Sequence, residues 1–356
     1  MSDRTVKRVA VVAGDGIGPE VIAEAVGVLE VLRETHGVAL ELKHFDWGAD
    51  KFLSEGVSLP AGALDMLTRE FDAILAGAFG DPRVPSNQHA EDILLGMRRG
   101  LDLYINLRPV RLLDARLTPL KDRTVEEINF VVFRENTEGA YCGAGGFLKK
   151  GTPDEIATQE ELNTRRGVER IIVAAFEYAQ ARGRQKVTMC DKSNVQRFGG
   201  DLWQRTFREV AARYEGIEAN HQYVDATAMY MVLNPAQFDV VVANNLFGDI
   251  LTDLGAALQG GLGLAASGNI HPGRVSLFEP VHGSAPPLAG KNVANPIGSI
   301  LTTAMMLEYL GHVEASRAVE RAVGECVNAH ETTRDLGGAL STQEAGEAIR
   351  RRLKKL

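Results

Sequence analysis

Short apolar runs alternate along the chain with longer amphipathic segments. Runs of five or six mostly apolar residues predict buried strands at 9–13, 71–76, 128–133, 186–190 and 238–243. Apolar residues at helical spacing predict helices, most clearly at 20–33 and 166–182. Strands and helices in alternation are typical of an α/β chain with a largely parallel sheet. Because ligands bind beyond the carboxyl ends of such strands, the residues that follow each run are the first candidates for function.

The composition limits the class of protein. A length of 356 residues exceeds what one compact core usually organises, so two domains or lobes are expected. The net charge of −8 argues against nucleic acid as the main partner. Three widely separated cysteines, Cys142, Cys190 and Cys326, do not form a disulfide framework, which fits a reducing compartment. No apolar run suits a signal peptide or a membrane span, so a cytoplasmic protein without a membrane partner is expected.

Two aspartates at the start of a predicted helix are the first candidates for chemistry. Asp249 and Asp253 follow the apolar run 238–243, and their spacing places both carboxylates on one helix face. Hard oxygen ligands with no Cys or His nearby suit Mg²⁺ or Mn²⁺. Solvated aspartates at this spacing are also common, so the pattern alone leaves an ordinary surface pair open. Asp225, after another short apolar stretch, is a possible third ligand.

Six motifs follow one another between residues 14 and 286, and the likeness that they carry extends from about residue 8 to the C-terminus. They are GDGIGPE at 14–20, NLRP at 106–109, RENTEG at 134–139, DKSN at 191–194, NLFGDILTD at 245–253 and FEPVHGSAP at 278–286. In this order they resemble the β-decarboxylating 2-hydroxyacid dehydrogenases, a family that acts on isopropylmalate, isocitrate, homoisocitrate and tartrate or malate. The resemblance implies two α/β lobes that share a largely parallel sheet core and not a Rossmann fold. Residues 1–103 and 260–356 would form the cofactor-binding lobe, and 104–259 the substrate, metal and dimerisation lobe.

The resemblance also assigns the metal ligands and the proton-transfer groups. Asp249 and Asp253 would hold Mg²⁺ or Mn²⁺, with Asp225 contributed by the second subunit of a homodimer whose active sites are shared. Lys192, acting across the dimer, would take the hydroxyl proton, and Tyr141 would protonate the enolate left by CO₂. Without the resemblance, a surface lysine and a half-buried tyrosine are the simpler interpretations.

Arginine suits carboxylate binding because its planar guanidinium can bond both carboxylate oxygens. Three arginines lie at positions that bind the substrate's carboxylates in the family: Arg98, Arg108 and Arg134. Taken singly, each is more often a surface or ion-pair arginine. The family reaction transfers a hydride from the substrate to a nicotinamide and then releases CO₂ from the β-keto acid.

The glycine-rich segment 14–18 lacks the full spacing of a dinucleotide-binding fingerprint, so a Rossmann interpretation is weak. The resemblance places the cofactor elsewhere, on a set of residues that comprises Ile17, His282, Gly283, Ser284, Ala285 and Asn295. An acidic residue that usually meets the ribose of NAD is replaced here by Pro287. Residues 284–290 contain no base that would receive the 2′-phosphate of NADP, so NAD is favoured.

The segment before Arg98 indicates the substrate. The resemblance assigns specificity to this segment, where Glu91, Leu94 and Leu95 present an apolar wall and a negative charge, which favours a branched alkyl group over a third carboxylate. The expected reaction is NAD-linked oxidative decarboxylation of 3-isopropylmalate to 4-methyl-2-oxopentanoate, in leucine biosynthesis. RENTEG and the FDWG segment at 45–48 favour tartrate or D-malate instead, and homoisocitrate is a further alternative. A non-catalytic regulatory paralogue is the alternative from another class, and core roles for Leu94 and Leu95 stay open.

Overall fold

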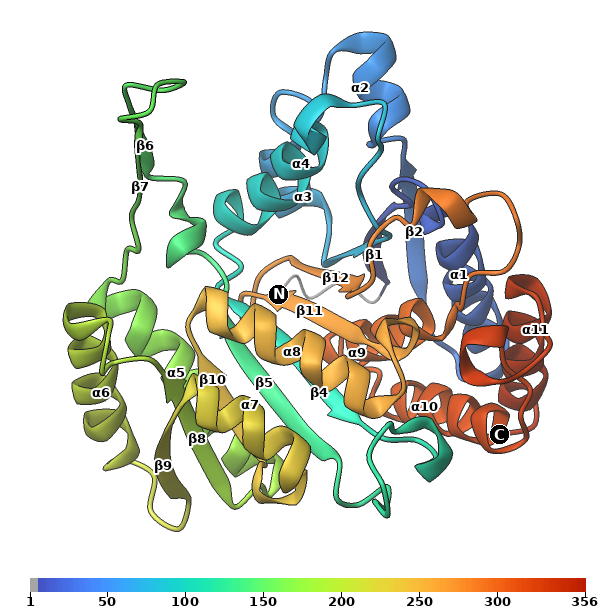
Figure 1. Cartoon of the computed structure of the whole chain (residues 1–356). Coiled ribbons are helices and arrows are strands. Elements are labelled where there is room, and N and C mark those ends of the chain that lie inside the picture. Colours follow the sequence, from blue (N-terminus) through green and yellow to red (C-terminus); the bar gives the residue numbers. More distant parts are fainter. Residues whose placement is uncertain (1–5) are drawn as a thin grey trace. The chain divides into compact units, whose positions relative to one another are not determined.

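The computed structural model describes residues 6–356, and the chain divides into two compact units (Figure 1). Unit 1 consists of the chain up to Leu103, Arg111–Val125 and Ala256–Leu356. Unit 2 consists of Tyr104–Val110 and Glu126–Gly255. The middle lobe expected at 104–259 therefore differs from unit 2 by one internal segment and by its last residues. The internal segment groups with unit 1 because its leucines, Leu113 and Leu117, pack against the core of that unit.

Unit 1 contains a mostly parallel sheet. Its strands lie in the order β2-β1-β3-β12-β11, and only the pair β11–β12 is antiparallel. Their bounds are β1 Lys7–Val12, β2 Leu40–Phe45, β3 Ala73–Ala76, β11 Ala266–Ile270 and β12 Ser276–Pro280. β3 and the last four residues of β1 are wholly buried, as expected of parallel strands that are covered on both faces. The predicted strands at 9–13 and 71–76 are confirmed with small shifts of their ends.

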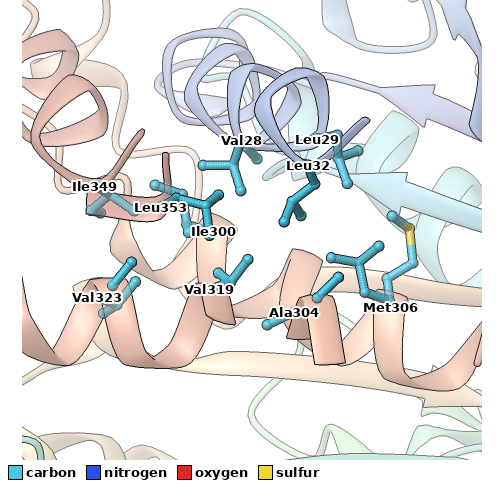
Figure 2. Packing of buried hydrophobic residues seen from close by; sticks show 14 of the residues in the cluster. Val28, Leu29, Leu32, Ile300, Ala304, Met306, Val319, Val323, Ile349 and Leu353 are labelled. Atoms are coloured by element: carbon cyan, nitrogen blue, oxygen red, sulfur yellow. The ribbon is translucent and has the colours of Figure 1, made fainter. Parts of the chain in front are cut away.

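Helices cover the sheet of unit 1 and supply most of its core. Their bounds are α1 Gly18–Thr35, α2 Ala49–Glu55, α3 Ala63–Glu70, α4 Gln88–Gly100, α9 Ile297–Tyr309, α10 Val313–Asn328 and α11 Thr342–Leu353. Figure 2 shows Leu32 of α1 directed toward residues of the C-terminal helices, among them Ile300, Val319 and Leu353. This packing explains why the two ends of the chain form one unit, although more than 200 residues separate them.

Unit 2 has its own α/β arrangement, with the strand order β4-β5-β10-β8-β9. β5, β10, β8 and β9 are parallel neighbours, which confirms the predicted sheet type. The strands are β4 Ile105–Arg111, β5 Asn129–Glu135, β8 Lys186–Asp191, β9 Glu218–Tyr223 and β10 Val240–Ala243. The helices are α5 Arg165–Arg182, α6 Arg197–Ala211, α7 Val224–Leu233 and α8 Asn245–Gln259.

The irregular segment at 143–153, which the sequence leaves open as an arm or a loop, begins an antiparallel hairpin. Its strands are β6 Gly145–Leu148 and β7 Ile156–Gln159, and both are exposed along their whole length. The hairpin extends away from α5 in Figure 1. None of the helices described between residues 6 and 356 is long and apolar enough to cross a membrane.

Candidate active site

Arg134 lies at the carboxyl end of β5, next to the start of α8. The parallel register pairs Arg134 with Ala243, the last residue of β10, so the arginine reaches the segment where α8 begins. Asn245 Oδ1 accepts hydrogen bonds from Arg134 Nε at 3.0 Å and Nη2 at 2.7 Å, and Nη1 donates to Asp249. A Cβ on Gly248 would lie 2.6 Å from the Arg134 Cβ, so only glycine allows this approach. Arg134 is 1% exposed and its guanidinium is fixed in place.

Tyr141 completes the surroundings of Asp249. The Tyr141 hydroxyl donates to Asp249 Oδ2 at 2.8 Å, and the Arg134 guanidinium lies 5.1 Å from the centre of the tyrosine ring. One carboxylate thus receives a cation on one oxygen and a phenol on the other. The arrangement joins a candidate metal ligand, a candidate carboxylate-binding residue and a candidate proton donor.

Arg108 approaches the same helix from β4. Its Nη1 donates to Thr252 Oγ1 at 2.6 Å, while its guanidinium lies 3.6 Å from Asp249 and 3.8 Å from Asp253. Partial desolvation and the like charge of Asp249 raise the pKa of Asp253, and Arg108 acts in the opposite direction. The predicted pair of aspartates therefore lies beside two arginines, with one residue, Thr252, that the sequence did not single out.

The donor set of α8 fits part of a hard-cation site. Asp249 and Asp253 offer carboxylate oxygens one helical turn apart, and the side chain of Asp253 is 62% exposed. Within residues 6–356, no group of three His, Cys, Asp or Glu side chains is placed to hold one metal ion. Asp225, the third predicted ligand, therefore does not join the other two within one chain.

Asp225 instead pairs with Lys192. Lys192 follows β8, Asp225 lies in the first turn of α7, and Lys192 Nζ is 2.8 Å from Asp225 Oδ1. This bond holds the pKa of Asp225 below its usual range. Asp191, next to the lysine, accepts from the Ser193 amide at 3.0 Å and contacts the His221 ring at 2.7 Å. The structure thus brings together the two residues that the resemblance assigns to a partner subunit.

The two glutamates of the RENTEG motif support the local backbone. Glu135 accepts from the amides of Thr137 and Glu138 at 2.8 and 2.9 Å, and burial raises the pKa of Glu135. Glu138 accepts from the amide of Thr164, the N-cap residue of α5, at 2.8 Å. Gly167 leaves the room that the Glu138 carboxylate needs beside this helix. These contacts explain why the motif holds a sharp loop between Arg134 and Tyr141.

Helix α4 of unit 1 carries the other predicted substrate residues. Arg98 Nη2 lies 2.9 Å from Glu279 Oε1, which also accepts from Asn269 at 2.9 Å. Leu94 packs against the buried cluster that contains Ile93 and Met97, whereas Leu95 is partly buried outside that cluster. Glu91 is exposed. One of the two leucines is therefore largely a core residue, and the other is available for contact.

The predicted cofactor residues belong to a connected part of unit 1. The Ile17 amide donates to the Ser284 carbonyl at 2.8 Å, and a Cβ on Gly16 would lie 2.0 Å from that oxygen. Ile17 is buried against a small cluster that Ala285 also contacts. Ala285 has a φ of 40°, which turns the chain sharply after the serine.

The other two polar candidates, His282 and Asn295, differ in how many of their side-chain atoms are already hydrogen-bonded within the fold. Burial lowers the pKa of His282, whose Nε2 is buried without a hydrogen-bond partner. Asn295 uses both ends of its amide: Nδ2 donates to Asp335 at 2.9 Å, and Oδ1 accepts from the Ile297 amide at 3.0 Å. Gly283 and Pro287 are exposed on the same loop. His282 therefore has an unused ring nitrogen, whereas Asn295 is held within the fold.

Sequence reasoning missed three residues that organise the site: Asn245, Thr252 and Glu279. Asn245 and Thr252 lie inside a motif that the sequence singled out, on the helical turns next to Asp249. Glu279 lies in another motif, but its partner Arg98 is 181 residues away in the chain. Motif membership was the only signal for all three, because their partners come from distant parts of the chain.

Comparisons with known proteins agree with the geometry. The isocitrate/isopropylmalate dehydrogenase family model matches residues 8–349. A 3-isopropylmalate dehydrogenase of Thermobifida fusca is 48% identical over 355 residues, covering 99% of this chain and 99% of that protein. One from Mycobacterium tuberculosis is 47% identical over 344 residues, with coverage of 96% and 98%. The crystal structure of isocitrate dehydrogenase from Methylococcus capsulatus has a TM-score of 0.88 and 38% identity, covering 98% of this chain and 100% of that one. The chain therefore belongs to the isocitrate/isopropylmalate dehydrogenase family, as its six motifs predict.

Proposed function

We propose that this chain oxidises 3-isopropylmalate to 4-methyl-2-oxopentanoate with NAD and a divalent cation, a step of leucine biosynthesis. The observation that carries the reaction type is the cluster in which Arg134 and Tyr141 both bond Asp249, with Arg108 close by. It combines carboxylate binding, a hard-cation ligand and a proton donor at one helix start. A regulatory paralogue that has lost catalysis needs none of these groups to be intact.

The residues have distinct tasks in the proposed reaction. Arg108 and Arg134 bind substrate carboxylate, together with Arg98 from α4. Lys192 of one subunit would accept the hydroxyl proton, and a bound nicotinamide would supply the hydride acceptor. After CO₂ leaves, Tyr141 gives its hydroxyl proton to the carbon that lost the carboxylate. A divalent cation bound at Asp249 and Asp253 supplies a Lewis acid that stabilises negative charge on oxygen.

Leu95, the leucine of the pair that lies outside the core cluster, supports the assignment of the substrate. An apolar wall stabilises a buried alkyl group by about 0.8 kcal/mol per carbon and offers no partner to a third carboxylate. The two relatives described above that are 47–48% identical are named 3-isopropylmalate dehydrogenases, whereas the isocitrate dehydrogenase is 38% identical. The apolar wall and the sequence identities therefore both favour the branched substrate over isocitrate.

The motifs that favour tartrate or D-malate have structural tasks in this chain. The glutamates of RENTEG bond backbone amides of their own loop and of α5. In FDWG, Trp47 is 4% exposed, and its ring centre lies 4.6 Å from that of Phe45 in a tilted arrangement. These two glutamates and Trp47 therefore have roles within the fold, so their presence does not weigh against 3-isopropylmalate.

NAD is the proposed cofactor, held by Ile17 and the segment 282–285 together with Asn295. Residues 284–290 carry no charged side chain, and Pro287 is exposed. No basic group there matches a 2′-phosphate, which favours NAD over NADP. The ribose contact that an acidic residue makes elsewhere in the family has no counterpart at Pro287, so cofactor affinity rests on the backbone and on His282.

A homodimer is the proposed assembly. α7 consists mostly of apolar residues, yet Met229, Tyr230, Val232 and Leu233 are 39–58% exposed. The hairpin also exposes Phe147, at 57%, and its isolated strands lack a core of their own. A second copy of unit 2 would cover these surfaces and supply Lys192 and Asp225 to the site. A reducing, cytoplasmic location belongs to the same proposal, since all three cysteines are free.

The proposed function is tested by comparing kcat/KM for 3-isopropylmalate, D-malate, tartrate, isocitrate and homoisocitrate, each with NAD and with NADP and Mn²⁺. We expect 3-isopropylmalate with NAD to give the highest value. Higher efficiency on D-malate would overturn the substrate, and absence of turnover on all five would favour the regulatory paralogue.

The assembly is tested separately by light scattering on a Leu233→Asp variant. Leu233 is 58% exposed on α7, so the charge should convert the dimer to a monomer without loss of folded structure. Leu53→Asp is a matched control, because Leu53 is 47% exposed on α2 of unit 1. A wild-type monomer, or equal effects of both substitutions, would contradict the proposed interface.

A further inference from the structure

Asp15, in the glycine-rich motif that neither metal nor substrate binding explains, is a buried hub of hydrogen bonds. It is 7% exposed, and its carboxylate accepts from the amides of Ala49 at 2.6 Å and Gly80 at 2.9 Å. Its third partner is the His89 ring, whose Nε2 lies 2.8 Å away. One carboxylate therefore joins the motif loop to the start of α2, to the segment after β3 and to α4.

His89 is a fully buried polar residue in the first turn of α4. It is 0% exposed, its ring stacks on Phe52 of α2 at 6.0 Å, and its Nδ1 has no hydrogen-bond partner. A proton on Nδ1 would be buried without an acceptor, so the ring carries its proton on Nε2 and donates it to Asp15. The bond to Asp15 is thus the one polar bond that this side chain makes among the described residues.

The start of α4 lacks a side-chain cap. Its N-cap residue, Asn87, makes no side-chain capping bond and has a φ of 52°. Ser86 before it has a φ of 54°, a conformation that is unfavourable for residues other than glycine. With no cap, the first turn of α4 is fixed by the insertion of His89 and its bond to Asp15.

Asp15 also leads to the predicted cofactor loop. Gly16 and Ile17 follow directly, and the Ile17 amide donates to the Ser284 carbonyl at 2.8 Å. The Gly80 amide bonds Asp15, and a Cβ on Gly80 would lie 3.2 Å from the Ser284 hydroxyl oxygen, so this segment passes close to the loop. A continuous set of bonds therefore runs from α4 through His89 and Asp15 to the backbone of Ser284.

We propose that His89 is a positioning residue that, through Asp15, fixes α4 to the cofactor loop, so that hydroxyacid binding and cofactor binding reinforce each other. The inference rests on the proposed function, because α4 carries Leu95 and Arg98 and the loop carries Ser284. A shift of α4 moves the hydroxyacid-binding side chains, and the same bonds transmit it to the loop. Coupling between two sites requires a physical link that both ligands bias, and this bond is that link.

The matched variants are His89→Gln and His89→Asn. A glutamine amide reaches the place of Nε2 and can donate to Asp15, whereas the shorter asparagine amide does not reach it. Ile93→Val is the control for destabilisation of the helix, since Ile93 is 0% exposed on α4 and belongs to its apolar core. All three are made in the full-length chain.

The measurement is the NADH dissociation constant, from cofactor fluorescence, with and without 3-isopropylmalate and Mg²⁺. For the wild type and His89→Gln we expect the hydroxyacid to tighten NADH binding by roughly tenfold, within the usual range of coupling. For His89→Asn we expect little tightening and a larger change in KM for the hydroxyacid than in kcat. Ile93→Val should keep the coupling even where it lowers Tm.

Equal coupling in His89→Asn and His89→Gln would overturn the proposal, and so would equal loss in Ile93→Val. A wild type that binds NADH but neither binds nor oxidises 3-isopropylmalate would refute the proposed substrate instead. The same comparison is then made with whichever of the five hydroxyacids the wild type oxidises. Nitrogen NMR of the free protein adds a ligand-free readout: a neutral His89 ring that carries its proton on Nδ1 and none on Nε2 would also contradict the bond to Asp15.

Discussion

Leu95→Ala separates substrate recognition from core packing on α4. Glu91, Leu95 and Arg98 recur at helical spacing on one face, whereas Leu94 packs into the cluster of Ile93 and Met97. If the alkyl group of 3-isopropylmalate lies against Leu95, truncation to alanine removes apolar contact with that group. The same change removes no partner of a substrate that lacks the alkyl group.

The expected size follows from the carbon atoms removed. Leucine to alanine deletes three carbons, worth at most about 2.4 kcal/mol at about 0.8 kcal/mol each. Leu95 is already partly buried by the protein, so we take about half of this, about 1.2 kcal/mol. That corresponds to a roughly eightfold decrease in kcat/KM for 3-isopropylmalate.

The assay compares kcat/KM for 3-isopropylmalate and D-malate in the wild type, Leu95→Ala and Leu94→Ala. Leu95→Ala should lower the first value and change the second less than about twofold, since D-malate has no alkyl group to lose contact. Leu94→Ala should act mainly on stability, lowering the free energy of unfolding by about 2–3 kcal/mol. Equal losses on both substrates in Leu95→Ala, or a substrate-selective loss in Leu94→Ala, would refute the assignment of the two leucines.

Three further predictions concern single groups. Lys192→Met should lower kcat by about 10²–10⁴-fold while calorimetry still detects substrate binding, and near-normal turnover would exclude the lysine as the base. Asp249→Asn should raise the Mn²⁺ concentration needed for half-maximal turnover, and an unchanged Mn²⁺ titration would count against the metal ligand. Burial lowers the pKa of His282 below 6.5, so the unfolded chain takes up a proton first as the pH falls. The free energy of unfolding, measured in urea, should therefore decrease as the pH falls through 6.5, and it should decrease less in His282→Gln. The same pH dependence in both proteins would show that the burial of His282 does not contribute to it.

The sequence predicted the buried strands because they are continuous apolar runs, and it missed strands that lack such a run. β9 has the sequence Glu-Ala-Asn-His-Gln-Tyr and lies at the edge of its sheet. Its side chains are not buried there, so the strand needs no continuous apolar run. β2 is the corresponding edge strand of unit 1, and no residue of it is fully buried. Edge strands form because they hydrogen-bond to the backbone of a neighbouring strand, and the sequence of the edge segment alone does not show that this neighbour exists.

The candidate site was predicted as a set of residues, without its internal bonds. The motifs named Arg134 and Asp249, and the resemblance that they carry added Tyr141, but the bonds among the three depend on the register of β5 and β10. The sequence did not distinguish the roles of Leu94 and Leu95, because helical spacing alone does not show which leucine faces the core. The sequence did not single out Glu279, because the role of its carboxylate depends on an ion pair with Arg98, which lies in a distant part of the chain.

The bond between Lys192 and Asp225 has a genetic consequence. Under the proposed assembly, this pair serves the neighbouring subunit's site, whereas Asp249 serves the site of its own chain. A chain with Lys192→Met and a chain with Asp249→Asn are each strongly impaired alone at limiting Mn²⁺, yet their mixed dimer contains one site with every group intact. Random assembly of equal amounts would return about a quarter of the normal activity. Two defective alleles of this gene would then rescue each other in one cell.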